Sequence, residues 1–251
     1  MPNTPTEPAG TLSPALPGWL IPLSQLADSA APTGGFSHSL GLETYVADGV
    51  VHDEPTFVCW LSAMLAGPLT TCDALAIRLI AEALEADPDD LAQVWRIDRL
   101  LHAQALPRQV RDATVAMGAR MLAIATLVAP SPWLTAYTGR IGTGACHGHP
   151  AVAIALAGFR LGAPAEVLIG VHLQGVATTL TQNAVRLIPL GQNAGQRALA
   201  AVRPTVQDAA ERAAALTELD FGATLPGLEI AQLRHAAHAL EQGDEVALLA
   251  G

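Results

Sequence analysis

The sequence predicts an all-α protein, a single compact domain of about nine or ten helices, several of them buried. Apolar residues make up 51% of the chain but aromatic residues only 4%, so Ala, Leu, Val and Ile must form the core, and Ala is the strongest helix former. Apolar residues recur at the three- or four-residue spacing of a helix face in one stretch after another. No stretch shows the sustained alternation of a strand, and no repeat or change of composition divides residues 20–240.

The helical domain is expected to lie between a disordered, proline-rich lead-in and a flexible tail. The lead-in is residues 1–19, the domain 20–240 and the tail 241–251. The lead-in lacks the positive region and the continuous apolar stretch of a signal peptide. In chain order, the helices are expected over about 20–29, 37–47, 54–67, 69–85, 91–101, 107–124, 133–137, 151–159, 165–187 and 189–219.

Local signals mark where several of these helices begin or break. Asp53 is a good N-cap, with Pro55 in the first turn of its helix. Residues 87–90, Asp-Pro-Asp-Asp, combine a capping residue, a proline and acids near the positive end of the helix dipole, and so predict another helix start. Pro68 predicts a kink or break, and Pro204 predicts a bend in the last long helix.

Charge and cysteine content exclude several classes of protein. The formal net charge is −10, and the sequence contains no lysine, whereas nucleic-acid binders carry a basic patch. Cys59, Cys72 and Cys146 are odd in number and widely spaced, unlike a disulfide framework. One long uncharged stretch, residues 167–185, contains polar side chains that favour a helix buried in protein over a membrane span. We therefore expect a cytoplasmic protein that binds neither nucleic acid nor membrane.

The most chemically suggestive segment is the glycine-rich connection before the helix at 151–159. Cys146, His147 and His149 supply a thiol and two imidazoles, which are ligands for a borderline metal such as nickel or zinc. Neighbouring loop residues seldom converge on one ion, and His149 could instead cap the following helix. A nucleophile–base pair could be drawn from Cys146 and His147, or from Ser37 and His38, but side chains adjacent in sequence seldom face each other. The sequence contains none of the common hydrolase, metalloprotease or P-loop motifs.

Two other segments contain more uncharged polar side chains and turn glycines than folding alone requires. They are residues 27–43 and residues 182–197. Buried polar side chains need partners, so polar groups this close to apolar runs favour a surface that binds another protein. A helix hairpin and a kinked core helix remain the plain structural alternatives.

Both segments resemble the motifs of a known family. Residues 32–43 follow the pattern Pro-x-Gly-x-Phe-Ser-x-Ser-x-Gly-Leu-Glu, and residues 186–197, Arg-Leu-Ile-Pro-Leu-Gly-Gln-Asn-Ala-Gly-Gln-Arg, are similar to its Arg-Leu-x-Pro-Leu-Gly-Gln core motif. The His149–Pro150 pair also occurs where that family has a His-Pro before a helix. On these motifs the chain, over about residues 20–235, resembles the urease accessory protein UreF family. The end departs from the family pattern, because Ala236 replaces a glutamate after His235.

The resemblance implies a non-catalytic scaffold that assists nickel insertion into urease. It implies a cytoplasmic homodimer that bridges UreD (also called UreH) and the GTPase UreG and modulates GTP-dependent nickel delivery to the urease apoprotein. It implies no tightly bound cofactor, with nickel in transit at most. The departure at Ala236 puts the UreD contact in doubt. The alternatives are an unrelated helical adaptor and a small metal or thiol enzyme that uses the 146–149 loop. The candidate partner-binding residues are Pro32, Gly34, Phe36, Ser37, Ser39, Glu43, Arg186, Gln192, Gln196 and His235.

Overall fold

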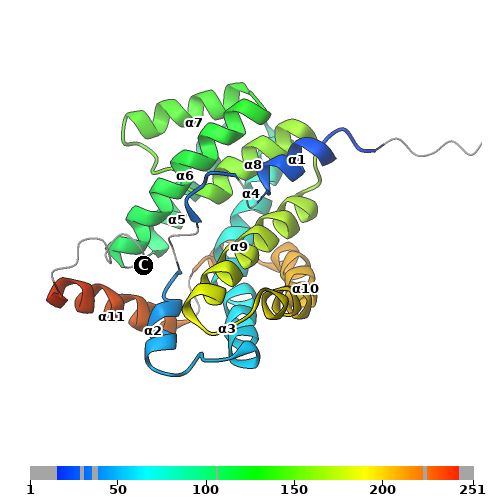
Figure 1. The fold of residues 1–251 in the computed structure, drawn as a ribbon. Helices are drawn as coiled ribbons and strands as arrows, with labels where there is room; N and C mark the ends of the chain where they lie inside the picture. The colour runs from blue at the N-terminus through cyan, green and yellow to red at the C-terminus, as the bar shows by residue number, and fades with distance from the viewer. Residues whose placement is uncertain (1–15, 29–30, 36–38, 106, 223–224, 243–251) are drawn as a thin grey trace, which may run out of the picture.

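The predicted all-α class is confirmed, because all regular secondary structure among the described residues is helical. A computed structural model describes residues 16–28, 31–35, 39–105, 107–222 and 225–242, with the backbone alone for 235–242. The short elements are a π-helical turn, η2 (Leu69–Ala74), and a 3₁₀ turn, η3 (Glu218–Asp220). The α-helices, shown in Figure 1, are α1 (Leu20–Leu26), α2 (Leu42–Ala47), α3 (Glu54–Ala66), α4 (Leu75–Ala86), α5 (Ala92–Gln104), α6 (Arg108–Val128), α7 (Pro132–Gly142), α8 (Pro150–Leu161), α9 (Ala165–Leu187), α10 (Gln192–Ala215) and α11 (Pro226–Gln242).

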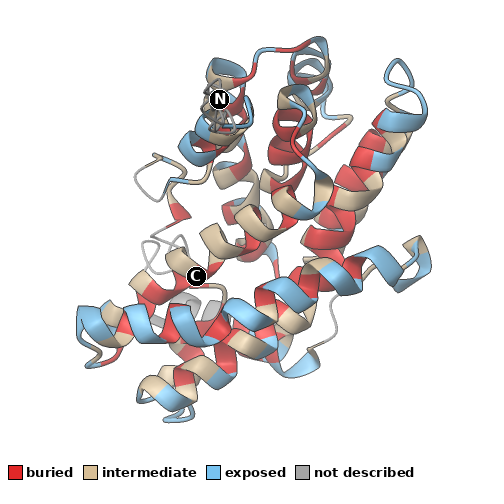
Figure 2. Ribbon diagram, turned by 90° about the vertical axis from the view of Figure 1, so that its right-hand side faces the viewer, coloured by how far each residue is buried: buried red, intermediate tan, exposed pale blue. Residues whose placement is uncertain are grey.

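Helix α8 lies at the centre of the core. Residues 151–158 are all buried, and a helix that is apolar on every side is stable only when protein surrounds it. Helices α4, α6, α7 and α9 pack around it. Gly158 permits the close approach of α9, because a Cβ there would lie 2.1 Å from Cδ2 of Leu168. The outer helices carry buried and exposed residues on opposite faces, as Figure 2 shows.

The helix starts that were predicted from capping residues are confirmed in one case and wrong in another. The Asp53 side chain accepts a hydrogen bond from the Thr56 amide at 3.0 Å, and the two residues form a capping box at the start of α3. The start predicted at residues 87–90 is wrong. These residues form a turn in which the Asp90 side chain accepts from the Ala92 amide, and α5 begins at Ala92 without a side-chain cap. The acids satisfy local amides instead of continuing a helix.

Other boundaries differ from the expectation by up to several residues. The short helix expected over 133–137 is the longer α7, which Ser131 caps by accepting from the Leu134 amide. Within the helix expected over 37–47, only Leu42–Ala47 is helical, and residues 36–38 lie outside the described part of the chain. The last long helix ends at Ala215, with Pro204 inside it.

The kink or break predicted at Pro68 is confirmed, because α3 ends at Ala66 and Gly67 leaves helical geometry (φ −98°, ψ −110°); a π-helical turn follows Pro68. Helix α3, residues 67–68, η2 and α4 together form one apolar helical stretch, Glu54–Ala86. By length and composition alone this stretch could cross a membrane, but 61% of its most apolar window is buried inside the fold, as in the core helix of a globular protein. A π-turn widens the helix, and such turns are frequent at functional sites.

Helix α11 packs against α2 and the residues just before it. The Thr44 hydroxyl donates to the Ala231 carbonyl at 2.8 Å, and the Gln232 side chain donates to the Leu40 carbonyl at 3.1 Å. Gly41, with φ +90°, allows this approach, because a Cβ there would lie 2.8 Å from Cγ of Gln232. The C-terminal helix and the first motif therefore belong to one packed unit.

Candidate functional site

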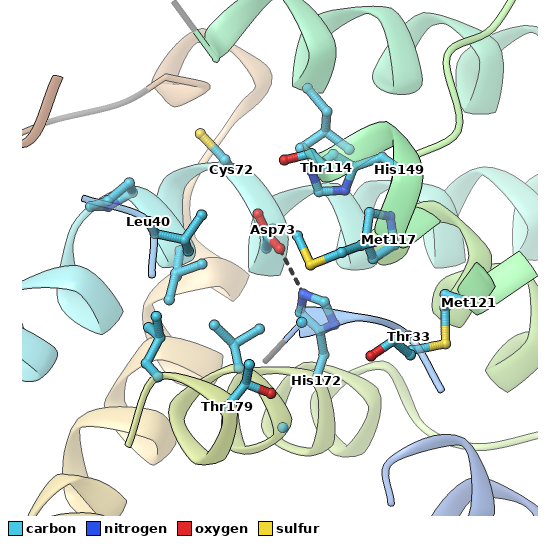
Figure 3. Close-up of a pocket in the computed structure, with 18 of the residues that line it drawn as sticks. Thr33, Leu40, Cys72, Asp73, Thr114, Met117, Met121, His149, His172 and Thr179 are labelled. Atoms are coloured by element: carbon cyan, nitrogen blue, oxygen red, sulfur yellow. Dashed lines mark hydrogen bonds and ion pairs between the residues drawn. The ribbon is translucent and has the colours of Figure 1, made fainter. Parts of the chain in front are cut away.

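A cavity of about 250 Å³ lies between α9 on one side and α5 and α6 on the other. The η2 turn and the first residues of α8 complete its wall, together with parts of α1, α3, α11 and the segment between α1 and α2. Figure 3 shows Asp73 near its centre, with His172, His149, Met117 and Met121 around it. Most of the lining is apolar, so the few ionisable side chains, such as Asp73, His149 and His172, determine what the cavity can bind.

A buried pair of side chains, Asp73 on η2 and His172 on α9, joins the two walls. The Nε2 atom of His172 lies 2.6 Å from Oδ2 of Asp73, and the imidazole must donate because an ionised carboxylate only accepts. Burial raises the pKa of Asp73, but the hydrogen bond from His172 and the nearby His149 outweigh it and hold that pKa below its usual value. Asp73 is therefore ionised at neutral pH and held in place by His172.

His149 lines the same cavity from the N-terminus of α8. Its Nδ1 atom accepts a hydrogen bond from the Ala151 amide at 3.2 Å, so this residue is the N-cap of α8. Burial lowers the pKa of the His149 imidazole, although the Asp73 charge opposes the shift. The ring is therefore neutral at pH 7 and carries its proton on Nε2. The capping role considered from the sequence is confirmed.

The loop that carries His149 is anchored by a carboxylate from α5. Asp98 is fully buried and accepts three hydrogen bonds, from the Tyr137 hydroxyl at 2.5 Å, the His147 amide at 2.6 Å and the Gly148 amide at 3.1 Å. The Tyr137 oxygen in turn accepts from the His149 amide at 2.8 Å. Burial and the adjacent Asp98 charge raise the pKa of the Tyr137 hydroxyl, which stays protonated. A buried charge is tolerated where its lone pairs are satisfied in this way, so Asp98 fixes the loop.

The three predicted metal ligands, Cys146, His147 and His149, take separate partners. His147 stacks on His102 of α5, with ring centroids 3.6 Å apart and planes 7° from parallel. Cys146 is buried, and burial together with the Asp98 charge raises the pKa of its thiol to about 11. The His149 side chain caps the N-terminus of α8. Among the described residues no three or more His, Cys, Asp or Glu side chains are grouped as metal ligands, and the geometry gives the predicted metal site no support.

The sequence is similar to those of known proteins. A model of the UreF family matches residues 51–203. The chain is 48% identical to the urease accessory protein UreF of Arthrobacter sp. (strain FB24) over 215 residues, which cover 86% of the chain and 92% of that protein. Those of Paenarthrobacter aurescens and Lachnoclostridium phytofermentans are 45% and 42% identical, over 86% of the chain and 93% and 94% of theirs. The chain belongs to the UreF family.

Along the first UreF-family motif, the structure distinguishes exposed from buried residues. Pro32 is exposed, whereas Ser39 is buried and donates from its hydroxyl to Oε2 of Glu43 at 2.5 Å, which ties the turn to the start of α2. Gly34 has φ +77°, and a Cβ there would collide with the Arg120 guanidinium. The predicted residues Phe36 and Ser37, together with His38, lie outside the described residues.

Along the second UreF-family motif, three of the predicted residues are exposed. Arg186 is at the end of α9, where it hydrogen-bonds the Asn183 side chain, and Gln192 and Gln196 are in the first turns of α10. Arg197, the last residue of the motif, forms a two-pronged ion pair with Glu54 of α3. His235 lies on α11, and its side chain is outside the described part of the chain. Partner binding by these residues stays a prediction.

Sequence reasoning missed the residues that organise the site. Asp73, Asp98, Tyr137 and His172 were not among the predicted site residues. One signal in the sequence could have pointed to the site: the carboxylate of Asp73 lies inside an otherwise apolar helical run. An ionised group that is buried there requires a partner. The sequence could not name that partner, because Asp73 and His172 are 99 residues apart.

Proposed function

We propose that the chain is a non-catalytic scaffold in urease maturation, which bridges UreD and the GTPase UreG and modulates GTP-dependent delivery of nickel to apo-urease. The observation that carries the proposal is its likeness, over 86% of the chain, to proteins named urease accessory protein UreF. The proposal includes a cytoplasmic homodimer, no tightly bound cofactor, and nickel as cargo in transit.

Two structural features support a binding role over a thiol enzyme. The Cys146 thiol is buried and its pKa is raised to about 11, so it holds little of the nucleophilic thiolate at neutral pH. The neighbouring His147 ring is stacked on His102. In contrast, exposed polar side chains gather around the α9–α10 turn at Arg186, Gln192 and Gln196, where a partner can reach them.

The function is tested in a strain that carries urease and its accessory genes but lacks this one. We expect that urease from this strain folds and assembles but holds little nickel and has little activity, and that the full-length chain restores both. Affinity purification of the chain should recover UreD and UreG. Full nickel occupancy without the chain would refute the role, and nickel delivery without a complex of the three proteins would refute the bridge.

The partner surface is tested by a double substitution at the α9–α10 turn. Gln192→Ala with Gln196→Ala removes two exposed amides from the first turns of α10, and Arg203→Ala removes an exposed side chain further along the same helix. The double variant should recover less partner protein than the Arg203→Ala control, with an unchanged melting temperature. A loss of thermal stability in the double variant would show that these side chains support the fold, and normal recovery of the partners would exclude them from the interface.

A further inference from the structure

The ionisable groups of the cavity between α6 and α9 are unbalanced. Its lining includes the carboxylates of Asp73 on η2 and Glu229 on α11, and two imidazoles, those of His149 and His172. No arginine belongs to the lining that the described residues provide, and the chain has no lysine. Even with His172 protonated, the carboxylates outnumber the positive groups, so the cavity attracts a cation and repels an anion.

The rest of the lining fits an aliphatic body. Met117 and Met121 of α6 and Val176 and Thr179 of α9 line the cavity, with Leu40 at one side; Figure 3 shows Met117 near Asp73 and Met121 beside Thr33. Methionine side chains adapt to irregular apolar shapes. An engineered apolar cavity of about 150 Å³ already admits benzene, and this one has about 250 Å³. It can hold more than a single ion.

Two simpler occupants fit less well. A purely apolar ligand would remove water from the Asp73 carboxylate without replacing it, and an uncompensated buried charge is costly. A bare metal ion needs three or four converging ligands, and the described residues contain no such group. A ligand with a positive polar head and an apolar body satisfies both parts of the lining.

We propose that this cavity binds a small organic cation, a guanidinium or primary ammonium group on a short aliphatic stem, with its head at Asp73 and its stem against Met117 and Val176. This site is independent of the scaffold role. Its test requires only the purified chain, so it can fail while the urease-maturation proposal stands, and the reverse also holds.

The test compares two probes of the same shape by isothermal titration calorimetry. The n-butylguanidinium ion carries the charge, and N-butylurea is its neutral isostere. We expect the cation to bind at least about tenfold more tightly than the urea. Equal affinities would show an apolar cavity without selectivity for charge, and the absence of binding by the cation in the millimolar range would show that the cavity takes no such ligand. Either result overturns the proposal.

Two glycines of α9 provide a matched pair of steric variants. A Cβ at Gly175, which lines the cavity, or at Gly170, which does not, would meet no atom within 4 Å. Gly175→Leu should fill the cavity and abolish binding, whereas Gly170→Leu should bind the cation as the native chain does. Both variants should fold, because leucine is a better helix former than glycine. Unchanged affinity in Gly175→Leu would place the ligand elsewhere and refute the site.

The charge requirement is tested at Asp73. Asp73→Asn keeps the shape of the side chain and removes its charge, and it should reduce the affinity for n-butylguanidinium by at least about tenfold while leaving that for N-butylurea unchanged. Glu85→Gln removes an exposed carboxylate of α4 outside the cavity and should change neither affinity. An equal loss for both probes in Asp73→Asn would mean that the substitution reshapes the cavity, and would refute the assignment of the head group to Asp73.

Discussion

Removal of the Asp98 carboxylate should destabilise the protein strongly, because three hydrogen-bond donors depend on this buried acceptor. The substitution Asp98→Ala leaves the Tyr137 hydroxyl and the His147 and Gly148 amides without their acceptor. A hydrogen bond to a charged group is worth about 1.5–3 kcal/mol, and each stranded donor costs about 1–3 kcal/mol. Allowing for partial access of water to the half-buried loop, we expect the free energy of unfolding to fall by about 3–5 kcal/mol.

Two comparison variants separate this network from general damage. Tyr137→Phe removes one of the three donors and the acceptor of the His149 amide, and should cost about 1–2 kcal/mol. Asp112→Ala removes an exposed carboxylate of α6 that pairs with Arg108, and should cost less than about 1 kcal/mol. The variants, from most to least stable, should therefore be Asp112→Ala, Tyr137→Phe and Asp98→Ala.

Urea denaturation and thermal melting measure these differences. For a chain of this size, 1 kcal/mol lowers the melting temperature by about 2–4 °C, so Asp98→Ala should melt about 6–20 °C below the native protein. Hydrogen exchange of the loop around Gly148 should accelerate more than exchange in α10. A melting temperature for Asp98→Ala within about 2 °C of that of the native chain, or loop exchange at the native rate, would refute the anchoring role.

Three further predictions concern packing, thiol chemistry and pH. Gly118→Ala should lower the melting temperature, because its Cβ would lie 2.1 Å from the Gly148 carbonyl oxygen. A Cβ at Gly139 meets no atom within 4 Å, so Gly139→Ala should raise the free energy of unfolding by up to about 1 kcal/mol. Equal effects of the two substitutions would contradict the close packing at Gly118. The exposed thiol of Cys59 should react with Ellman's reagent at pH 8 before the buried thiols of Cys72 and Cys146, whose pKa values are raised to about 12 and about 11. Simultaneous reaction of all three thiols would contradict the burial of Cys72 and Cys146. The pKa of His149 is lowered in the folded protein, so below about pH 6.5 the unfolded chain binds more protons than the folded one. The free energy of unfolding should therefore fall as the pH drops through that value, and it should fall less in His149→Gln. Parallel pH profiles for the two proteins would contradict this role of His149.

The features that local chemistry controls were predictable from the sequence. The capping box at Asp53 follows from a short acid placed next to a proline-containing first turn. His149 was recognised as a possible cap because proline, here Pro150, is favoured at the first position of a helix. The misplaced start at residues 87–90 shows the limit of this approach. The same acids satisfy a turn as well as a helix N-terminus, and here Asp87 and Asp90 accept from the amides of Asp89 and Ala92 in a turn.

The cavity depends on contacts that no local pattern encodes. Asp73 reaches His172 across 99 residues, and Asp98 reaches the Gly148 amide across 50. The π-helical turn that begins after Pro68 adds an element that helical periodicity cannot reveal, because its wider turn shifts the register of the side chains that follow. The sequence singled out the loop for its thiol and imidazoles, and the structure divides those three side chains among three different partners.

The sequence by itself determined that this is an all-helical chain of the UreF family type, because composition, helical spacing and two long motifs are properties of neighbouring residues. Only the tertiary structure decided that a carboxylate from η2, an imidazole from α9 and the cap of α8 meet around one cavity. The physical reason is that an ionised group can be buried only beside partners that compensate its charge, and the packing of the helices alone brings those partners together.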